Sequence, residues 1–171
     1  MLPIFVDVEA SSFAGDSYPI EIAWNMPDSK IENHLINPYC IKEWIDWDPA
    51  SQAVHGLSRN YLSNNGEPPL SVAKRMNKVL SGCDVYSDAA EYDAFWIDQL
   101  FKVTGLIREF SVRDFYSLLP NEITNGYFMS NNSVLSKYQE KARKRAGVAA
   151  HRASHDVKYL VELYMMTVLQ Y

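Results

Sequence analysis

Two carboxylates lie two residues apart inside an apolar run near the start of the chain, in the stretch IFVDVEASSF at 4–13. Successive side chains alternate between the two faces of a strand, so Asp7 and Glu9 would point the same way. Like charges on one face repel each other, and burying them without a partner is costly. A cation held between them would resolve the conflict. The alternative is that the strand ends at Val6 and that Asp7 begins a polar loop.

Carboxylates interrupt apolar stretches at two further places. Asp93 lies about one turn into an expected helix at 91–105, directly after a short strand. His151 and Asp156 lie five residues apart at the start of the last helix. Each residue turns an α-helix by about 100°, so within one helix these two side chains would point about 140° apart. They can converge if His151 lies in the loop before the helix. The alternative is a surface histidine and a carboxylate that is favoured by the helix dipole.

The elements that must position these residues follow from the spacing of apolar residues. Strands are predicted at 2–11, 18–26, 31–38, 83–89 and 110–119, the last running into a helix. Helices are predicted at 68–82, 91–105, 131–147 and 153–171, with short helices or structured loop at 48–65. The apolar stripe of the last helix is predicted to contain Val157, Leu160, Val161, Tyr164 and Met165. The order of elements indicates an α/β fold whose mixed central sheet begins with three antiparallel strands.

Composition limits the classes of protein to consider. The 171 residues suit a single domain (1–171), and a hydrophobic fraction of 47% is enough for a core. A net charge of −5 argues against broad electrostatic binding to duplex DNA. Cys40 and Cys83 lack metal-ligand spacing and are interpreted as reduced core thiols. No apolar run approaches the roughly 18 residues of a membrane span, so we expect a cytoplasmic protein with no membrane partner.

The three acidic segments together resemble the motifs of the DnaQ-like (DEDDh) 3′–5′ exonuclease family, which belongs to the RNase H-like superfamily. FVDVEASSF resembles the first motif of that family, DAAEYDAFWIDQL the second, and HRASHD the third. AVHGLSRNYL is similar to the HGI segment of the family. The resemblance extends over about residues 3–165 and implies an RNase H-like sheet flanked by helices.

The resemblance also implies a metal centre. Its ligands would be Asp7, Glu9, Asp93 and Asp156, which would hold two Mg²⁺ (or Mn²⁺) ions per active site. Both metals prefer oxygen ligands. Two such ions about 3.5–4 Å apart can clamp the attacking and leaving oxygens of an in-line displacement. This chemistry explains why the first strand carries two carboxylates.

The third motif implies a histidine general base. His151 takes the place of the family's histidine, and a neutral imidazole there can accept the proton of the attacking water. His155 is the rival, one residue before Asp156. On a helix His155 would face about 100° away from that aspartate, which favours His151.

Substrate contacts follow from the same alignment and are implied for Ala10, Ser11, Ser12, His55 and Tyr92. Ala10 and Ser11 replace the two threonines that are usual in the first motif, so a backbone contact to the terminal base is retained and a hydroxyl contact is lost. Asp88 stands where the family often has histidine and adds negative charge beside the site.

A cluster of cations precedes the third motif, at Lys137, Lys141, Arg143, Lys144 and Arg145. It is interpreted as a solvated helix face; the alternatives are a wall that guides substrate phosphates or the surface of a homodimer.

The resulting hypothesis is a metal-dependent 3′–5′ exonuclease. It would act on the 3′ ends of single-stranded or short RNA or DNA and release nucleoside 5′-monophosphates. The alternatives are a binding module on the same fold that has lost catalysis, and a proofreading subunit that works with a polymerase.

Overall fold

A five-stranded mixed sheet forms the centre of the protein. The computed structural model describes residues 2–124, 134–147 and 151–170. The strands are β1 (Ile4–Ala10), β2 (Pro19–Asn25), β3 (Ile31–Leu35), β4 (Asp84–Ser87) and β5 (Ser111–Asp114). They lie in the order β3-β2-β1-β4-β5. The first three are antiparallel to one another, whereas β4 runs parallel to β1 and β5 parallel to β4. The predicted mixed sheet with an antiparallel start is therefore confirmed.

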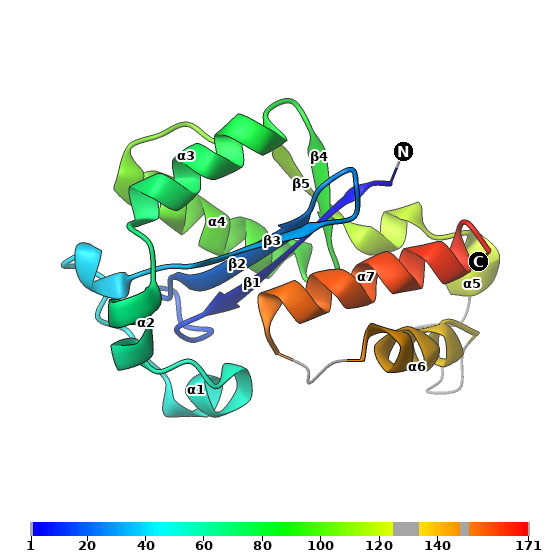
Figure 1. Cartoon of the computed structure of the whole chain (residues 1–171), viewed down its shortest axis with the longest axis horizontal. Helices are drawn as coiled ribbons and strands as arrows, with labels where there is room; N and C mark the ends of the chain where they lie inside the picture. The colour runs from blue at the N-terminus through cyan, green and yellow to red at the C-terminus, as the bar shows by residue number, and fades with distance from the viewer. Residues whose placement is uncertain (1, 125–133, 148–150, 171) are drawn as a thin grey trace.

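Helices cover both faces of this sheet. Helices α3 (Pro69–Leu80) and α4 (Ala90–Thr104) lie on one side, and α6 (Val134–Ala146) and α7 (Ala153–Thr167) lie on the other (Figure 1). All four were predicted: α3, α4 and α7 from their apolar positions, and α6 as a strongly charged helix that ends at Gly147. The part of the sequence prediction for α6 that covers 131–133 lies outside the described residues.

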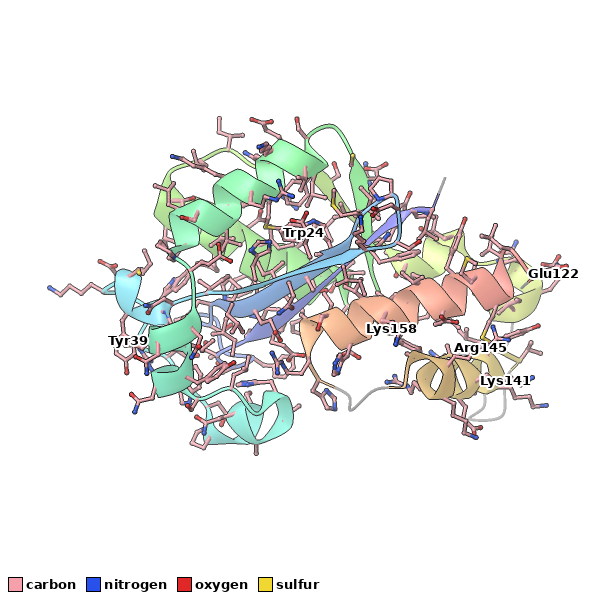
Figure 2. The ribbon with its side chains drawn as sticks, viewed as in Figure 1. Trp24, Tyr39, Glu122, Lys141, Arg145 and Lys158 are labelled. Carbon is pink, nitrogen blue, oxygen red and sulfur yellow. The ribbon has the colours of Figure 1, made fainter. Side chains whose placement is uncertain are left out.

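Alternation along β1 separates two hydrophobic clusters. Val6 and Val8 belong to the cluster under α3 and α4, together with Trp24, which Figure 2 shows between the sheet and α3. Phe5 belongs to the other cluster, beneath α7. The next two side chains on the Phe5 face of the strand are the two carboxylates of the first motif. They therefore lie on the same side of the sheet as α7.

Helix α7 is buried over a different face from the one that its sequence predicted. Val157 and Leu160 are buried as expected, but Val161, Tyr164 and Met165 are only half-buried. The other buried positions of the helix are Ala153, Tyr159, Leu163, Met166 and Thr167. The reason is that α7 packs against the sheet and also against α6, so two neighbours rather than one decide which side chains are covered.

Short helices fill the connections between these elements. They are η1 (Pro38–Cys40), α1 (Pro49–His55), α2 (Arg59–Asn65), η2 (Phe115–Leu118) and α5 (Asn121–Thr124). Helix α1 begins after Asp48, whose carboxylate accepts hydrogen bonds from the backbone N–H groups of Ala50 and Ser51. Gly56 ends it with a φ of 72°, a left-handed conformation that glycine adopts readily. These two caps place His55 at the end of α1.

The cysteine prediction is wrong for one of the two residues. Cys83 is half-buried, but Cys40 is exposed on η1, in a connection that runs over the surface. Both thiols are free. Among the helices that the structure describes, none is long and apolar enough to cross a membrane.

Candidate active site

A cleft of about 600 Å³ opens beside the C-terminal end of β1. Its walls come from β1 and the loop that follows it, from α1, from the first turn of α4, from α6 and from the start of α7. Among the residues that the sequence nominated for the site, Asp7, Glu9, Ala10, Ser12, His55, Tyr92, Asp93, His151 and Asp156 all line it. Ser11 is the exception.

Three carboxylates meet at one point of this cleft. Asp7, Glu9 and Asp156 each place an oxygen within 4.8 Å of the others. The strand alternation of β1 sets the first two on one face. Asp156 joins them from the first turn of α7, although it lies almost 150 residues away in the sequence. All three side chains are half-buried.

Asp93 lines the same cleft from the first turn of α4, where it is 1% exposed. Its Oδ2 accepts a hydrogen bond from the hydroxyl of Ser87, the last residue of β4. Strand β4 runs parallel to β1, so the carboxyl ends of the two strands meet at one edge of the sheet. This parallel pairing brings Asp93 to the carboxylates of β1.

His151 lies in the loop before α7, the location that convergence with Asp156 requires. Its backbone N–H donates to Asp156 Oδ2 at 3.0 Å, and its φ is 69°. A left-handed φ is uncommon for a residue with a Cβ, and surrounding structure has to hold it. The imidazole is exposed at the cleft. His155, its rival, does not line the cleft in the described structure.

Burial and mutual repulsion raise the pKa values of the clustered carboxyls. Burial, followed by the charges of Asp93 and Glu9, raises the pKa of Asp7 well above its ordinary value. Burial, followed by the charge of Asp156, raises the pKa of Glu9 to about 7. Burial also raises the pKa of Asp88, a further carboxyl that lines the cleft. Without added positive charge, these groups destabilise one another in their ionised form.

Arg143 supplies positive charge from α6. It lines the cleft, and its guanidinium lies 4.4 Å from the centre of the Tyr159 ring. Among the described residues, the other four cations of this helix do not line the cleft. Lys144 pairs with Glu140 on the same helix, and Figure 2 shows Lys141 and Arg145 on α6. Which cation reaches the cleft depends on how α6 packs against α7.

His55 is buried at the end of α1 and lines the cleft. Its Nδ1 accepts a hydrogen bond from the backbone N–H of Leu57 at 3.0 Å, so the proton of the neutral ring is on Nε2. Nε2 has no hydrogen-bond partner within the described part of the chain. Burial lowers the pKa of this histidine and favours the neutral form. The ring at the wall of the cleft therefore carries a buried N–H donor on Nε2.

The hydroxyl of Ser11 is used within the fold. It donates to Asp46 Oδ2 at 2.7 Å and accepts the backbone N–H of Tyr18, and the side chain is fully buried. The hydroxyl of Ser12 donates to the same carboxylate oxygen, at 2.7 Å. These bonds tie the loop after β1 to a distant segment.

An aromatic cluster borders the cleft, and of its three members the sequence motifs implied only Tyr92. It consists of Phe13, Tyr92 and Trp96, whose ring centres lie 5.4–5.8 Å apart. The indole of Trp96 is held by a hydrogen bond to Ser17 Oγ at 2.8 Å, whereas Phe13 is 74% exposed. Because most phenylalanines are interpreted as core, the sequence offered no signal that this ring would lie on the surface.

No family model matches the sequence, and no curated protein matches it. Solved structures do match the fold. E. coli exonuclease I in complex with a dA16 oligonucleotide is similar with a TM-score of 0.67 and 16% identity, over 98% of this chain and 41% of that one. Exonuclease I from Methylocaldum szegediense is similar with a TM-score of 0.70 and 12% identity, over 98% of this chain and 41% of that one. The zinc-bound E. coli ExoI–ssDNA complex has a TM-score of 0.67 and 17% identity, over 95% of this chain and 40% of that one.

These likenesses show the fold. The chain has the RNase H-like architecture of exonuclease I, which confirms the fold implied by its motifs. It spans about two fifths of the length of the exonuclease I chains that it matches.

Proposed function

We propose that this chain, which shares the fold of exonuclease I, is a metal-dependent 3′–5′ exonuclease that acts on single-stranded nucleic acid. One observation carries the proposal: Asp7, Glu9 and Asp156 converge to within 4.8 Å in a cleft that Asp93 also lines. A phosphodiester is negatively charged and would be repelled by this cluster alone. Cations held by the carboxylates are therefore required before substrate can bind.

The four carboxylates suit Mg²⁺ or Mn²⁺. They provide only oxygen donors, which these hard ions prefer. The raised pKa values of Asp7 and Glu9 indicate that the cluster lacks compensating positive charge, which divalent ions would supply. Asp7, Glu9, Asp93 and Asp156 would hold two ions. When bound, such ions neutralise charge on the attacking and leaving oxygens of the phosphodiester.

We assign the general base to His151. Its exposed imidazole lies at the cleft and can accept the proton of the attacking water when it is neutral. The hydrogen bond from its backbone N–H to Asp156 keeps the base next to the carboxylates. Attack by water at the last phosphodiester would release a nucleoside 5′-monophosphate and leave a new 3′-hydroxyl on the strand.

The surroundings of the carboxylates favour a single-stranded substrate. The cluster of Phe13, Tyr92 and Trp96 offers ring faces and edges at the rim, and aromatic side chains bind unpaired bases by stacking. His55 offers a buried N–H donor, and the guanidinium of Arg143 can pair with a phosphate. The exonuclease I structures named above with dA16 and with ssDNA contain single strands.

Digestion of a 5′-labelled single-stranded oligonucleotide tests the proposal, with matched DNA and RNA of one sequence. We expect a ladder that shortens from the 3′ end, mononucleotide product, a requirement for Mg²⁺ or Mn²⁺, and loss of activity with EDTA. Asp7→Asn should abolish turnover while the circular dichroism spectrum stays unchanged. Rapid cleavage of a circular single strand would exclude an exonuclease. Binding of the oligonucleotide without any hydrolysis would favour the binding module.

A further inference from the structure

Glu21 is a charged residue that is fully buried in the middle of β2. It lies directly opposite Glu9 in the antiparallel pairing of β1 and β2. A buried carboxylate without partners is strongly destabilising, so this position needs compensation. Glu21 lies outside the three acidic motifs and does not line the cleft in the described structure.

Four hydrogen-bond donors surround this carboxylate. Arg152 donates from Nε to Oε2 at 2.9 Å and from Nη2 to Oε1 at 2.7 Å. The backbone N–H of Ala153 donates to Oε2 at 3.1 Å, and the amide of Asn33 donates to Oε1 at 2.9 Å. Each oxygen thus accepts two bonds. A glutamine would turn an NH₂ group toward two donors, so an ionised carboxylate is the side chain that satisfies all four partners.

Three of these four donors, on the two residues Arg152 and Ala153, belong to the segment that carries the third motif. Arg152 occupies the N-cap position of α7, where its side chain has no acceptor to offer the helix. The N–H of Ala153 is one of the amides that a helix leaves unpaired at its start. Glu21 therefore caps α7 from a neighbouring strand. It also neutralises the arginine that follows His151.

We propose that Glu21 is a positioning residue for the nuclease: through Arg152 and Ala153 it fixes the segment from His151 to Asp156 against the sheet. This inference rests on the proposed function. His151 holds a left-handed φ of 69°, a conformation that needs such an anchor. The same anchor sets the first turn of α7, which brings Asp156 to within 4.8 Å of the carboxylates of β1.

The ion pair of Glu32 and Arg75 provides a matched control. Arg75 donates from both Nε and Nη2 to Glu32, so this pair is also bidentate. It joins β3 to α3 and does not line the cleft in the described structure. Glu32→Gln therefore removes the same chemical interaction away from the proposed site.

The first measurement compares kcat and KM on a single-stranded oligonucleotide. Glu21→Gln should lower kcat by about 10–100-fold, the usual effect of losing a partner that orients active-site groups, while KM changes by less than about threefold. Glu32→Gln should leave both near wild type. Arg152→Ala should lower kcat similarly, and added guanidinium, below concentrations that unfold the protein, should partly restore it. Equal kcat in Glu21→Gln and Glu32→Gln would overturn the inference.

The second measurement is amide hydrogen exchange of the metal-free proteins, which does not depend on activity. Glu21→Gln should make the amides of His151 and Ala153 exchange at least about tenfold faster, while the amide of Trp24 stays protected. If Glu21→Gln does not fold, Arg152→Ala takes its place. Unchanged protection of both amides would also overturn the inference. If wild type cleaves no nucleic acid, the proposed function fails, and exchange alone still decides whether Glu21 anchors the segment.

Discussion

Glu9→Gln should stabilise the metal-free protein at pH 8 and leave its stability at pH 4 unchanged. Burial and the charge of Asp156 raise the pKa of Glu9 from 4.5 to about 7 in the folded chain. A group whose pKa is higher in the folded state contributes stability at low pH and loses it as the pH rises through the folded pKa. Ionised Glu9 therefore destabilises the fold above about pH 7, and a neutral glutamine of similar shape removes that effect.

The size of this effect follows from the pKa. Each pKa unit corresponds to about 1.36 kcal/mol, so a rise from 4.5 to about 7 sets an upper limit near 3.4 kcal/mol. Solvent screening of this partly exposed side chain reduces the expected gain to roughly 1.5–2 kcal/mol. For a chain of this length, 1 kcal/mol shifts Tm by about 2–4 °C, so Tm should rise by about 3–8 °C at pH 8.

Thermal unfolding in EDTA across pH 4–8 measures this difference. Glu21→Gln is the control of opposite sign: although burial opposes it, hydrogen bonds from Arg152 and Asn33 hold the pKa of Glu21 below its ordinary value. Its ionised form therefore stabilises the fold above the ordinary pKa, and Glu21→Gln should lower Tm at pH 8. Saturating Mg²⁺ should remove the advantage of Glu9→Gln. The wild type keeps the Glu9 carboxylate as a metal ligand and is stabilised by the bound ion, whereas the variant has lost that ligand. A lower Tm for metal-free Glu9→Gln at pH 8 would refute the reasoning.

Three further results are expected. His151→Ala should lose about two to four orders of magnitude in kcat and still bind Mn²⁺, as measured by electron paramagnetic resonance, whereas His155→Ala should lose little. The reverse ranking would assign the base to His155. Arg143→Ala should raise KM several-fold at low salt with little change in kcat, and Lys141→Ala, on the same helix, should not; equal effects would assign phosphate binding to the whole helix. A 3′-phosphate should block digestion of an oligonucleotide in a gel assay, because the carboxylates around Glu9 repel it. Undiminished digestion would mean that the 3′ end of the substrate does not lie beside these carboxylates.

Much of the site could be predicted from the sequence because its geometry is local. The twofold period of a strand sets Asp7 and Glu9 on one face wherever β1 lies in the protein. Helical rotation likewise requires His151 to precede α7 if it is to meet Asp156, and the helix begins at Ala153. The strands and the helices α3, α4 and α7 followed from the same two periods, whereas α6 was predicted from its charge and from the glycine that ends it.

Contacts between distant segments were beyond those rules. Glu21 and Arg152 lie 131 residues apart, and their pairing depends on where α7 lies against β2. Arg143 faces the cleft, unlike the other cations of α6, because of how that helix packs on α7. The bond from Ser11 to Asp46 likewise depends on where a remote loop crosses the end of β1.

The sequence alone thus determined which residue types could bind metal and which elements carry them, because strand and helix periods act over a few residues. The tertiary structure decided how close the carboxylates lie, which cation joins them and what anchors the loop of His151. Those properties depend on strand register and helix packing. Both depend on the burial of side chains from the whole chain at once, which no short stretch of sequence contains.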